Sequence, residues 1–423
     1  MLVEYKIRNF RSLRNPAVLS FIPCPNGKEE AKPMAALKSE ELLKEAVIFG
    51  ANGSGKSALL ASMKVMQSLL NDSVAGSPGN ALHQIEPFGF DEKSRDLPAA
   101  FEVWAIVNDL KFVYGFSATQ KEVVEEYLYL YTSSRASTVF ERTGQDYKAP
   151  AKWKKYLSQY QSLVQPDSLF LGVAGKLSAE GQGKILADIY SWLTESIHFS
   201  TPKSLQTNGA QALRDGFLKQ GEWKNKMLDL IRLADFSIYD FQVRLTKANL
   251  NSFLHSQEEK SQSVKPRRTA WSLEEKIDII HLLQGKEYVL PLKKEGAGFQ
   301  KYFFLLFRII QTLEEGGVLV IDEMEASLHP FLVKEITDLF RDKITNPNNA
   351  QLIFTTHDVL LLEIGHFRPD EIWFMEKSRG KLDAQLYSLA DLSLRREKDY
   401  LNNYLLGRYG GVPYLLTSWL EED

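Results

Sequence analysis

The sequence of 423 residues contains a single cysteine, Cys24. One cysteine cannot form an intrachain disulfide or a zinc site, so we expect a protein of a reducing compartment. Long hydrophobic runs are also missing, because the longest strongly apolar run, residues 302–307, stops at Arg308 and is too short to span a membrane. The first 13 residues lack the apolar block of a signal peptide. These absences predict a cytoplasmic protein that does not contact membranes.

A large net charge is missing as well. The formal charge is −3, from 51 basic and 54 acidic residues, so the whole chain has no polycationic field for gripping nucleic acid. The densest basic run, Lys265, Arg267 and Arg268, is typical of a solvated loop. Apolar residues (44%) and charged residues (25%) occur at the levels of an ordinary folded protein, and the length suits two or three domains.

The N-terminal part of the chain predicts strands around one amphipathic helix. Residues 3–8 alternate apolar and polar side chains, which predicts a half-buried strand, and the apolar run 46–49 predicts a buried one. After them, apolar side chains recur at spacings of four, three and four residues, typical of a helix stripe: Leu59, Met63, Met66 and Leu70. Residues 71–80 are expected to form a loop. The runs 101–107, 112–117 and 123–131, with Asn108 and Asp109 in the first turn, predict an antiparallel meander.

The rest of the chain reads as helices followed by a parallel α/β unit. Residues 150–290 are expected to be mainly helical, apart from a polar loop at 256–270. A buried helix is expected at 299–313, and buried strands at 318–321, 352–355 and 372–375. Pro330 suits the first turn of a helix carrying Leu332, Ile336 and Leu339. Alternating strands and helices indicate a parallel sheet.

One segment predicts a phosphate-binding loop. It fits the pattern GxxxxGK(S/T) at every fixed position, between a buried strand and a helix: Gly50, Ala51, Asn52, Gly53, Ser54, Gly55, Lys56 and Ser57. Glycines let successive backbone N–H groups converge on phosphate oxygens. Lys56 would place its charge on the β- and γ-phosphates of ATP, and Ser57 would offer its hydroxyl to Mg²⁺.

Two carboxylates follow the strand at 318–321. We expect Asp322 to orient Mg²⁺ and Glu323 to activate the attacking water as general base. His357 follows another buried strand, where an imidazole can contact the γ-phosphate and report its presence.

Two further segments leave alternatives open. His329, within residues 326–329, fits either a contact with a second subunit or a histidine at a helix start before Pro330. The short glycine loop at 295–301 contains Glu295, Gly296 and Gly298 and precedes the buried helix. It fits either a simple helix cap or an anion site for the γ-phosphate of a neighbouring subunit's ATP.

The order of these motifs resembles ABC-type ATPase heads of the SMC, RecF and break-repair kind. It consists of a strand with Asn-Phe-Arg-Ser-Leu (9–13), the P-loop, a long insertion, a glycine loop, an apolar helix, the Asp-Glu pair and a histidine. The resemblance makes 50–57 the Walker A motif, Asp322 and Glu323 the Walker B pair, 326–329 the D-loop, His357 the switch histidine and 295–301 the signature. In that family two heads enclose two ATP molecules, which implies a homo-oligomer with composite sites.

The resemblance is closer still to a bacterial subgroup that includes the RloA, AriA and PtuA-like ATPases of anti-phage systems. The similar segments are 9–13, 321–330 and the C-terminal Gly-Arg-Tyr-Gly-Gly-Val-Pro of 407–413, within the regions 1–130 and 285–423. Such ATPases sense infection and control a separate nuclease or toxin, which implies an effector partner here. We find no nuclease motif in the chain.

Two departures from the family pattern qualify the expected activity. Family signatures usually carry a serine where this chain has Gly296, and that serine donates a hydrogen bond to the γ-phosphate. We therefore expect the protein to hydrolyse ATP, but slowly. The Q-loop glutamine has two candidates, Gln84 and Gln182.

The sequence thus predicts an α/β P-loop ATPase head of the ABC type, with an antiparallel β subdomain and an inserted, mainly helical lobe. The expected parts are 1–135, with Walker A and the meander, the lobe 136–285, and 286–423, with the remaining motifs. The favoured function is a sensor or scaffold ATPase of an anti-phage system, and the alternative is a RecF-like ATPase acting on DNA. A small-molecule kinase fits less well, because kinases lack an Asp-Glu pair followed by a histidine strand. The effector, the trigger, the oligomer size and any nucleic-acid partner are left open.

Overall fold

The computed structural model describes residues 1–24, 37–73, 82–133, 135–178, 180–200, 222–234, 237–243, 277–326, 328–377, 380, 382–392 and 399–412. The chain divides into two compact units. The first comprises Met1–Phe199, Thr312–Glu325 and Val333–Asp423, and the second comprises Ser200–Gln311 and Ala326–Leu332. The three-part division expected from the sequence stays a prediction. The loop expected at 256–270, with its basic run, lies outside the described residues, as does most of the loop expected at 71–80.

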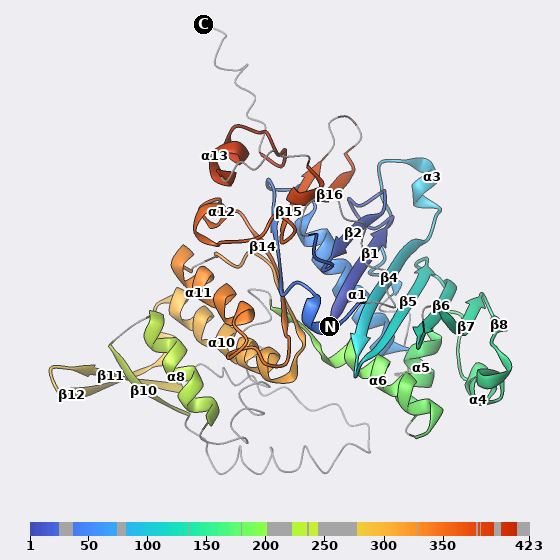
Figure 1. The fold of residues 1–423 in the computed structure, drawn as a ribbon, viewed down its shortest axis with the longest axis horizontal. Coiled ribbons are helices and arrows are strands. Elements are labelled where there is room, and N and C mark those ends of the chain that lie inside the picture. Colours follow the sequence, from blue (N-terminus) through green and yellow to red (C-terminus); the bar gives the residue numbers. More distant parts are fainter. Residues whose placement is uncertain are drawn as a thin grey trace, which may run out of the picture. The chain divides into compact units, whose positions relative to one another are not determined.

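A six-stranded sheet forms the centre of the first unit (Figure 1). Its order is β16-β15-β3-β14-β13-β9, with strands β16 (Ala384–Ser388), β15 (Ile372–Lys377), β3 (Glu45–Phe49), β14 (Gln351–Thr356), β13 (Val318–Ile321) and β9 (Ile197–Ser200). Strands β15, β3, β14 and β13 are parallel neighbours, and β16 is antiparallel to β15. Every residue of β3, β13 and β14 is buried, as the apolar runs predict for strands covered on both faces. The expected parallel α/β fold is confirmed.

A second sheet in this unit is antiparallel and has seven strands. Its order is β2-β1-β4-β5-β6-β7-β8, with bounds Ala17–Ser20, Leu2–Arg8, Ala99–Val107, Leu110–Ala118, Val123–Tyr131, Ser137–Thr143 and Asp146–Lys148. The expected meander is confirmed as β4, β5 and β6. Asn108 and Asp109 both adopt positive φ, 48° and 59°, as a two-residue hairpin turn of the type that favours Asn and Asp requires. Strands β7 and β8 extend this sheet beyond the strands that were expected from the sequence.

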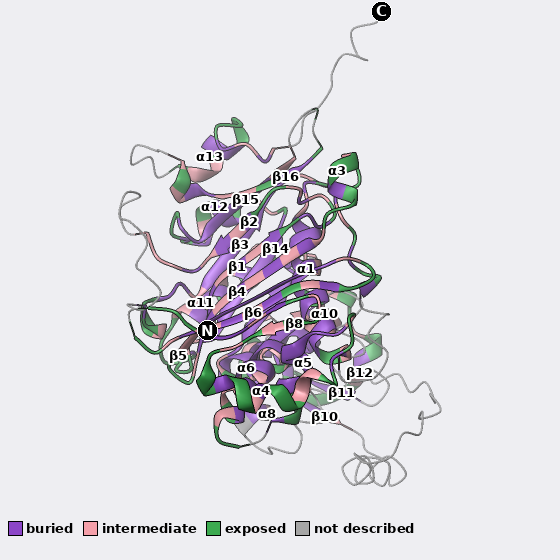
Figure 2. Cartoon of the chain, turned by 90° about the vertical axis from the view of Figure 1, so that its right-hand side faces the viewer, coloured by how far each residue is buried: buried purple, intermediate pink, exposed green. Residues whose placement is uncertain are grey.

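The buried amide of Gln351 joins the two sheets. Its Oε1 accepts a hydrogen bond from Leu2 N at 2.7 Å, and its Nε2 donates to Leu2 O at 2.9 Å and Leu43 O at 3.0 Å. Helix α1 (Lys56–Asp72) packs between the sheets, because one core cluster contains side chains of both sheets and of this helix. Figure 2 shows the strands of both sheets as predominantly buried. The predicted stripe of α1 is confirmed, since Leu59, Met63, Met66 and Leu70 are all buried.

Shorter helices complete the first unit. They are α3 (Glu92–Arg95), α4 (Ala151–Gln161), α5 (Phe170–Leu177), α6 (Gln182–Glu195), most of α11 (Pro330–Arg341), α12 (Leu361–Ile364) and α13 (Tyr400–Leu405), with 3-10 turns at Ser39–Glu41 and Leu389–Asp391. Helix α11 begins at Pro330, as predicted, but its buried stripe is Val333, Ile336, Thr337 and Phe340 rather than one through Leu332 and Leu339. Among the described residues, no helix has both the length and the apolar character needed to cross a membrane.

The second unit combines helices with a small sheet. It contains α8 (Glu222–Ala234), most of α10 (Ala297–Glu315), a 3-10 turn at Leu292–Lys294 and the antiparallel strands β10 (Ile238–Val243), β11 (Ile277–Leu283) and β12 (Lys286–Pro291). Helix α10 confirms the buried helix expected at 299–313, with rings such as Phe303 fully buried. The three strands were not predicted, because residues 150–290 were expected to be mainly helical. Strand β10 pairs with the distant β11, whereas β11 and β12 form a hairpin whose turn, Gln284 and Gly285, was overlooked.

A buried ion pair fixes α5, and through it α1. Glu126 on β6 accepts hydrogen bonds from Phe170 N at 2.6 Å, from Leu171 N at 2.9 Å and from the guanidinium of Arg142 at 3.3 Å. Both charged side chains are fully buried. Burial raises the pKa of Glu126, and the nearby charge of Arg142 opposes that rise. The carboxylate thus caps the N-terminus of α5, a favourable place for an anion.

Helix α5 touches α1 closely at Gly172. A Cβ atom added there would come within 2.7 Å of Leu70 O on α1. The backbones of the two helices therefore approach each other only because residue 172 has no side chain.

We predict that Arg142→Met lowers the free energy of unfolding by about 3–5 kcal/mol, because it leaves the buried Glu126 carboxylate without its counter-charge. Urea denaturation followed by circular dichroism measures the change. Lys154→Met on α4 is the matched control, since Lys154 is exposed and its loss is expected to cost less than about 0.5 kcal/mol. Equal stabilities of the two variants would contradict a structural role for the pair.

Candidate nucleotide site

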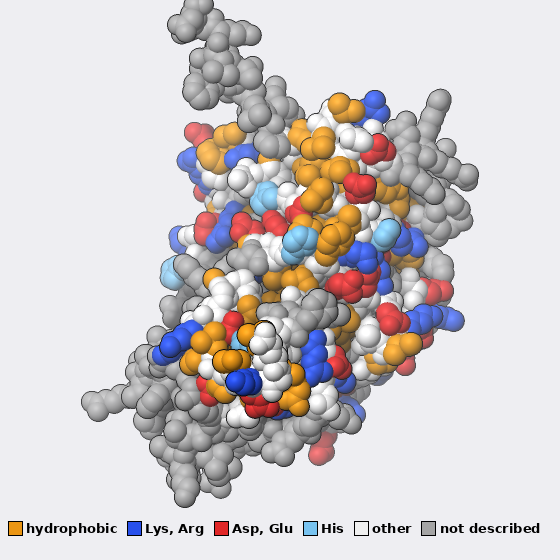
Figure 3. Space-filling model, turned by 90° about the vertical axis from the view of Figure 1, so that its left-hand side faces the viewer, with side chains coloured by type: hydrophobic (Ala, Val, Ile, Leu, Met, Phe, Trp, Pro, Cys, Tyr) orange, Lys and Arg blue, Asp and Glu red, His pale blue; other side chains and the backbone are white. Residues whose placement is uncertain are grey.

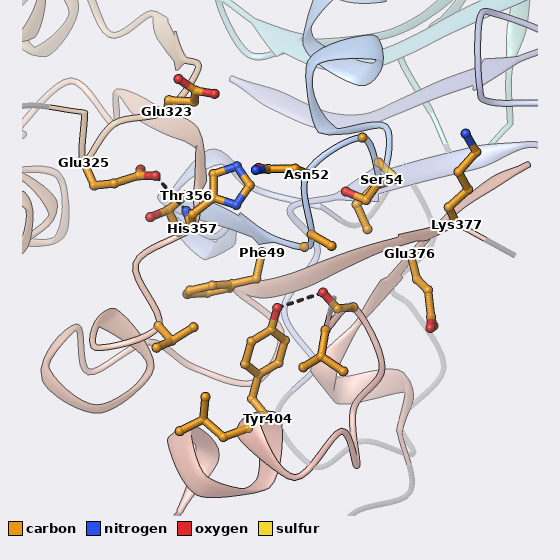
Figure 4. A pocket seen from close by; sticks show the side chains of 18 residues that line it. Phe49, Asn52, Ser54, Glu323, Glu325, Thr356, His357, Glu376, Lys377 and Tyr404 are labelled. Atoms are coloured by element: carbon orange, nitrogen blue, oxygen red, sulfur yellow. Dashed lines mark hydrogen bonds between the residues drawn. The ribbon is translucent and has the colours of Figure 1, made fainter. Parts of the chain in front are cut away.

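A cavity of about 980 Å³ opens at the carboxyl ends of the parallel strands in the first unit. Its lining residues come from the end of β3 and the P-loop, from the loops after β13 and β14, from the end of β15 and from the C-terminal segment (Figure 4): Phe49, Gly50, Ala51, Asn52, Gly53, Ser54, Glu323, Glu325, Thr356, His357, Val359, Met375, Glu376, Lys377, Tyr404, Leu405, Gly411 and Val412. Its size is that of ordinary small-molecule sites. The structure therefore brings residues 50–54 of the P-loop, Glu323 and His357 to one cavity, whereas the predicted site residues Gly55, Lys56, Ser57 and Asp322 are not among its lining residues.

The backbone of the P-loop depends on its glycines. Gly55 has φ +117° and a Cβ atom there would lie 2.7 Å from Ala384 Cβ and 2.9 Å from Ser12 Oγ. Gly53 has φ +73°, and a Cβ on Gly50 would collide with the carbonyl oxygen of Met375. Ser12 belongs to the Asn-Phe-Arg-Ser-Leu segment, which thus packs directly against the loop. Only glycine permits this tight turn without strain.

The start of α1 is suited to an anion. Its N-cap is Gly55, and no side chain caps the helix. The first N–H groups of a helix lack partners within the helix and carry partial positive charge, which is the arrangement that phosphate groups bind. The hydroxyl of Ser54 is also buried and has no hydrogen-bond partner among the described residues. The residues present therefore fit a nucleotide phosphate.

Lys56 lies folded back onto its own loop. Its Nζ donates to Gly50 O at 2.6 Å and to Ala51 O at 3.1 Å. Burial lowers the pKa of Lys56, and the negative charges of Glu325, Asp322 and Glu323 oppose that shift. The lysine charge thus lies close to three carboxylates and to the loop that would hold the phosphates.

The carboxylates are positioned by the hydroxyl of Thr355 on β14. It donates to Asp322 Oδ1 at 2.6 Å and accepts from Glu323 N at 2.8 Å. Glu323 has a φ of 53°, a left-handed conformation that costs free energy in a residue with a side chain and is concentrated at functional sites. Its side chain is exposed toward the cavity, whereas Asp322 is half-buried. Asp322 and Ser57 are thus available for Mg²⁺, and Glu323 for a water molecule.

Two groups of residues at this cavity were not predicted from the sequence. The first is Glu325, which accepts a hydrogen bond from His357 N at 2.8 Å. In the sequence, Glu325 could have been noticed as a further acidic residue two positions after Glu323. The second is the C-terminal segment, where the ring of Tyr404 stacks on Phe374 and lies 6.3 Å from that of Phe49, centroid to centroid. The glycine-rich motif at 407–413 was noticed, but its place beside the P-loop was not.

The remaining predicted residues lie elsewhere. Glu295, Gly296 and Gly298 belong to the second unit, at the start of α10, and His329 belongs to it as well. The Glu295 carboxylate is 2.8 Å from His281 Nε2, and the ring of His329 stacks on Phe331. Lys301 Nζ donates to Ala326 O, which joins the glycine-loop helix to the residues after Glu325. Neither Gln84 nor Gln182 lines the cavity. The roles of these residues stay predictions.

The fold and the motif geometry define a P-loop nucleotide-binding protein. The chain belongs to the family described as "AAA domain, putative AbiEii toxin, Type IV TA system", whose model matches residues 46–363, more than half of the sequence. No curated protein sequence matches the chain significantly.

Two solved structures are similar in backbone. One is the SMC head domain from Thermotoga maritima, with 13% identity, a TM-score of 0.42, and coverage of 92% of this chain and 98% of that one. The other is the Smc head domain with an extended coiled coil, bound to the C-terminal domain of ScpA, derived from Pyrococcus furiosus; it has 12% identity, a TM-score of 0.34, and coverage of 92% and 96%. At these TM-scores neither similarity bears on function.

We predict that Lys56→Ala weakens ATP binding at least about tenfold, or about 1.4 kcal/mol, because it removes the main positive charge of the loop. Isothermal titration calorimetry with Mg-ATP measures the affinity. Lys64→Ala, an exposed lysine farther along α1, is the matched control and is expected to bind like the wild type. Unchanged affinity of Lys56→Ala would show that this loop does not bind the nucleotide.

Proposed function

We propose that the protein binds Mg-ATP at this cavity and hydrolyses it slowly. One observation carries the proposal: residues 50–54 of the P-loop, Glu323 and His357 line the same cavity, and the Thr355 hydroxyl bonds to both Asp322 and the backbone of Glu323. Lys56 and the N–H groups at the start of α1 hold the phosphates. Ser57 and Asp322 hold Mg²⁺, which neutralises phosphate charge when it is bound. Glu323 accepts the proton of the attacking water, and His357 senses the γ-phosphate.

Slow turnover is proposed from the glycine loop. Gly296 occupies the place of the serine found in related signatures, so this chain lacks that hydroxyl. The absence is not forced by space, since a Cβ atom on Gly296 would meet no atom within 4 Å among the described residues. We propose that the loop completes the ATP site of a second subunit in a homo-oligomer, where a weakened signature would favour long-lived ATP-bound assemblies.

We predict that Glu323→Gln lowers ATP turnover by about 10² or more while ATP binding persists, because the amide keeps the shape but cannot accept the proton. Steady-state phosphate release and calorimetry separate the two quantities. Glu335→Gln, an exposed glutamate on α11, is the matched control. Turnover of Glu323→Gln at the wild-type rate would assign the general base to another group.

The biological role that we propose is control of a separate effector in a defence system. The described chemical motifs of the chain all serve nucleotide binding, and the family description names a type IV toxin–antitoxin system. ATP binding would stabilise one assembly, and a phage-derived ligand would prefer another. Moving such a balance from 1:99 to 99:1 requires about 5.5 kcal/mol of differential binding, but no fast turnover. A resemblance to the RloA, AriA and PtuA-like ATPases supports this role.

Two other biological roles compete with the controlling role. The family description also names a toxin, which favours a chain that is toxic by itself. A RecF-like ATPase would instead bind DNA. Figure 3 shows side chains of both charge signs interspersed among the described residues on one face.

Expression of the chain alone, and then together with its genomic neighbour, tests the controlling role. We predict that the chain alone neither protects cells from phage nor slows their growth, and that protection requires both proteins. Plating efficiency and growth curves give the result, with Lys56→Ala in the pair as the control for nucleotide dependence. Toxicity or protection from the chain alone would contradict the controlling role, and an ATP-dependent DNA complex without a protein partner would favour the RecF-like one.

A further inference from the structure

Glu325 connects two loops of the nucleotide cavity. It lies two positions after Glu323 in the loop that follows β13, and its Oε1 accepts the backbone N–H of His357 at 2.8 Å. His357 begins the loop that follows β14, and both residues line the cavity. Figure 4 shows the carboxylate of Glu325 directed at His357, with Asn52 of the P-loop on the other side of the imidazole. One hydrogen bond therefore ties the segment that carries Glu323 to the segment that carries His357.

The second oxygen of this carboxylate is unusual. Glu325 Oε2 is shielded from solvent and has no hydrogen-bond partner among the described residues. A buried polar atom without a partner is destabilising, and native structures contain few such atoms without a functional reason. The carboxylate of Glu325 is thus held beside His357 at a cost in stability.

We propose that Glu325 is a positioning residue: it holds the backbone of His357 so that the imidazole faces the γ-phosphate, which lets the protein distinguish ATP from ADP. The proposal rests on the proposed ATP site. A hydrogen bond to an ionised acceptor is among the stronger ones, so it can fix a loop that is otherwise exposed.

Two substitutions separate the hydrogen bond from the charge. Glu325→Ala removes the acceptor, whereas Glu325→Gln keeps an acceptor oxygen of the same reach without the charge. We expect Glu325→Ala to lower kcat about tenfold or more, the loss typical of one hydrogen bond to a charged group. We also expect it to reduce the ratio of affinities for a non-hydrolysable ATP analogue and ADP. Glu325→Gln is expected to restore both quantities to within about threefold of the wild type.

A double-mutant cycle with His357→Ala identifies the route of the effect. If Glu325 acts through the imidazole, Glu325→Ala adds no further loss of kcat in the His357→Ala background. Glu363→Ala, an exposed glutamate on α12, is the matched control, and circular dichroism of every variant verifies the fold. Additive losses, or a Glu325→Gln variant as impaired as Glu325→Ala, would overturn the positioning role. Wild-type protein that binds neither nucleotide would overturn the proposed function and this inference together.

Discussion

Strands β3, β14 and β13 are hydrogen-bonded to one another in parallel, with Phe49 opposite Thr356 and Ile321 opposite Phe354. This register brings the residues that follow the three strands to the same edge of the sheet. Asp322 therefore lies level with Thr355, which explains why one threonine hydroxyl reaches both the Asp322 carboxylate and the backbone of Glu323. A shift of one residue in either pairing would turn these side chains to the other face of the sheet. The candidate site is thus a direct consequence of strand register.

The same edge also explains why the chain holds several polar groups in costly arrangements. Glu323 adopts a left-handed backbone conformation, and Glu325 Oε2 and the Ser54 hydroxyl are buried without partners among the described residues. The buried core must offset these costs, through Gln351 between the sheets and the Glu126–Arg142 pair beneath α5. Groups prepared in advance for a ligand reorganise little when it binds, which is how preorganised sites gain their effect.

The sequence predicted those features whose signal is local. The P-loop is a contiguous pattern, and the stripe of α1, the buried runs of β3, β13 and β14 and the Asn108-Asp109 turn each follow from neighbouring residues. Strand β10 was missed because it pairs with a strand far along the chain, whereas the hairpin of β11 and β12 had a local signal, the Gln284-Gly285 turn, that was overlooked. Thr355 and Glu325 were missed because their importance depends on contacts between segments 32 or 33 residues apart in the sequence. The C-terminal wall of the cavity likewise depends on the packing of Tyr404 against Phe374 and Phe49, which no spacing reveals.

The central claim, that this cavity binds Mg-ATP, is tested most directly by the position of the Lys56 amine. In the structure, Lys56 Nζ donates to Gly50 O at 2.6 Å and to Ala51 O at 3.1 Å. A crystal structure of the wild-type protein with Mg²⁺ and a non-hydrolysable ATP analogue measures where this amine lies when ligand is bound. The account predicts that Lys56 leaves both carbonyls for the β- and γ-phosphates, with Asp322 and Ser57 beside the metal ion. A nucleotide bound elsewhere, with Lys56 still on the two carbonyls, would contradict it.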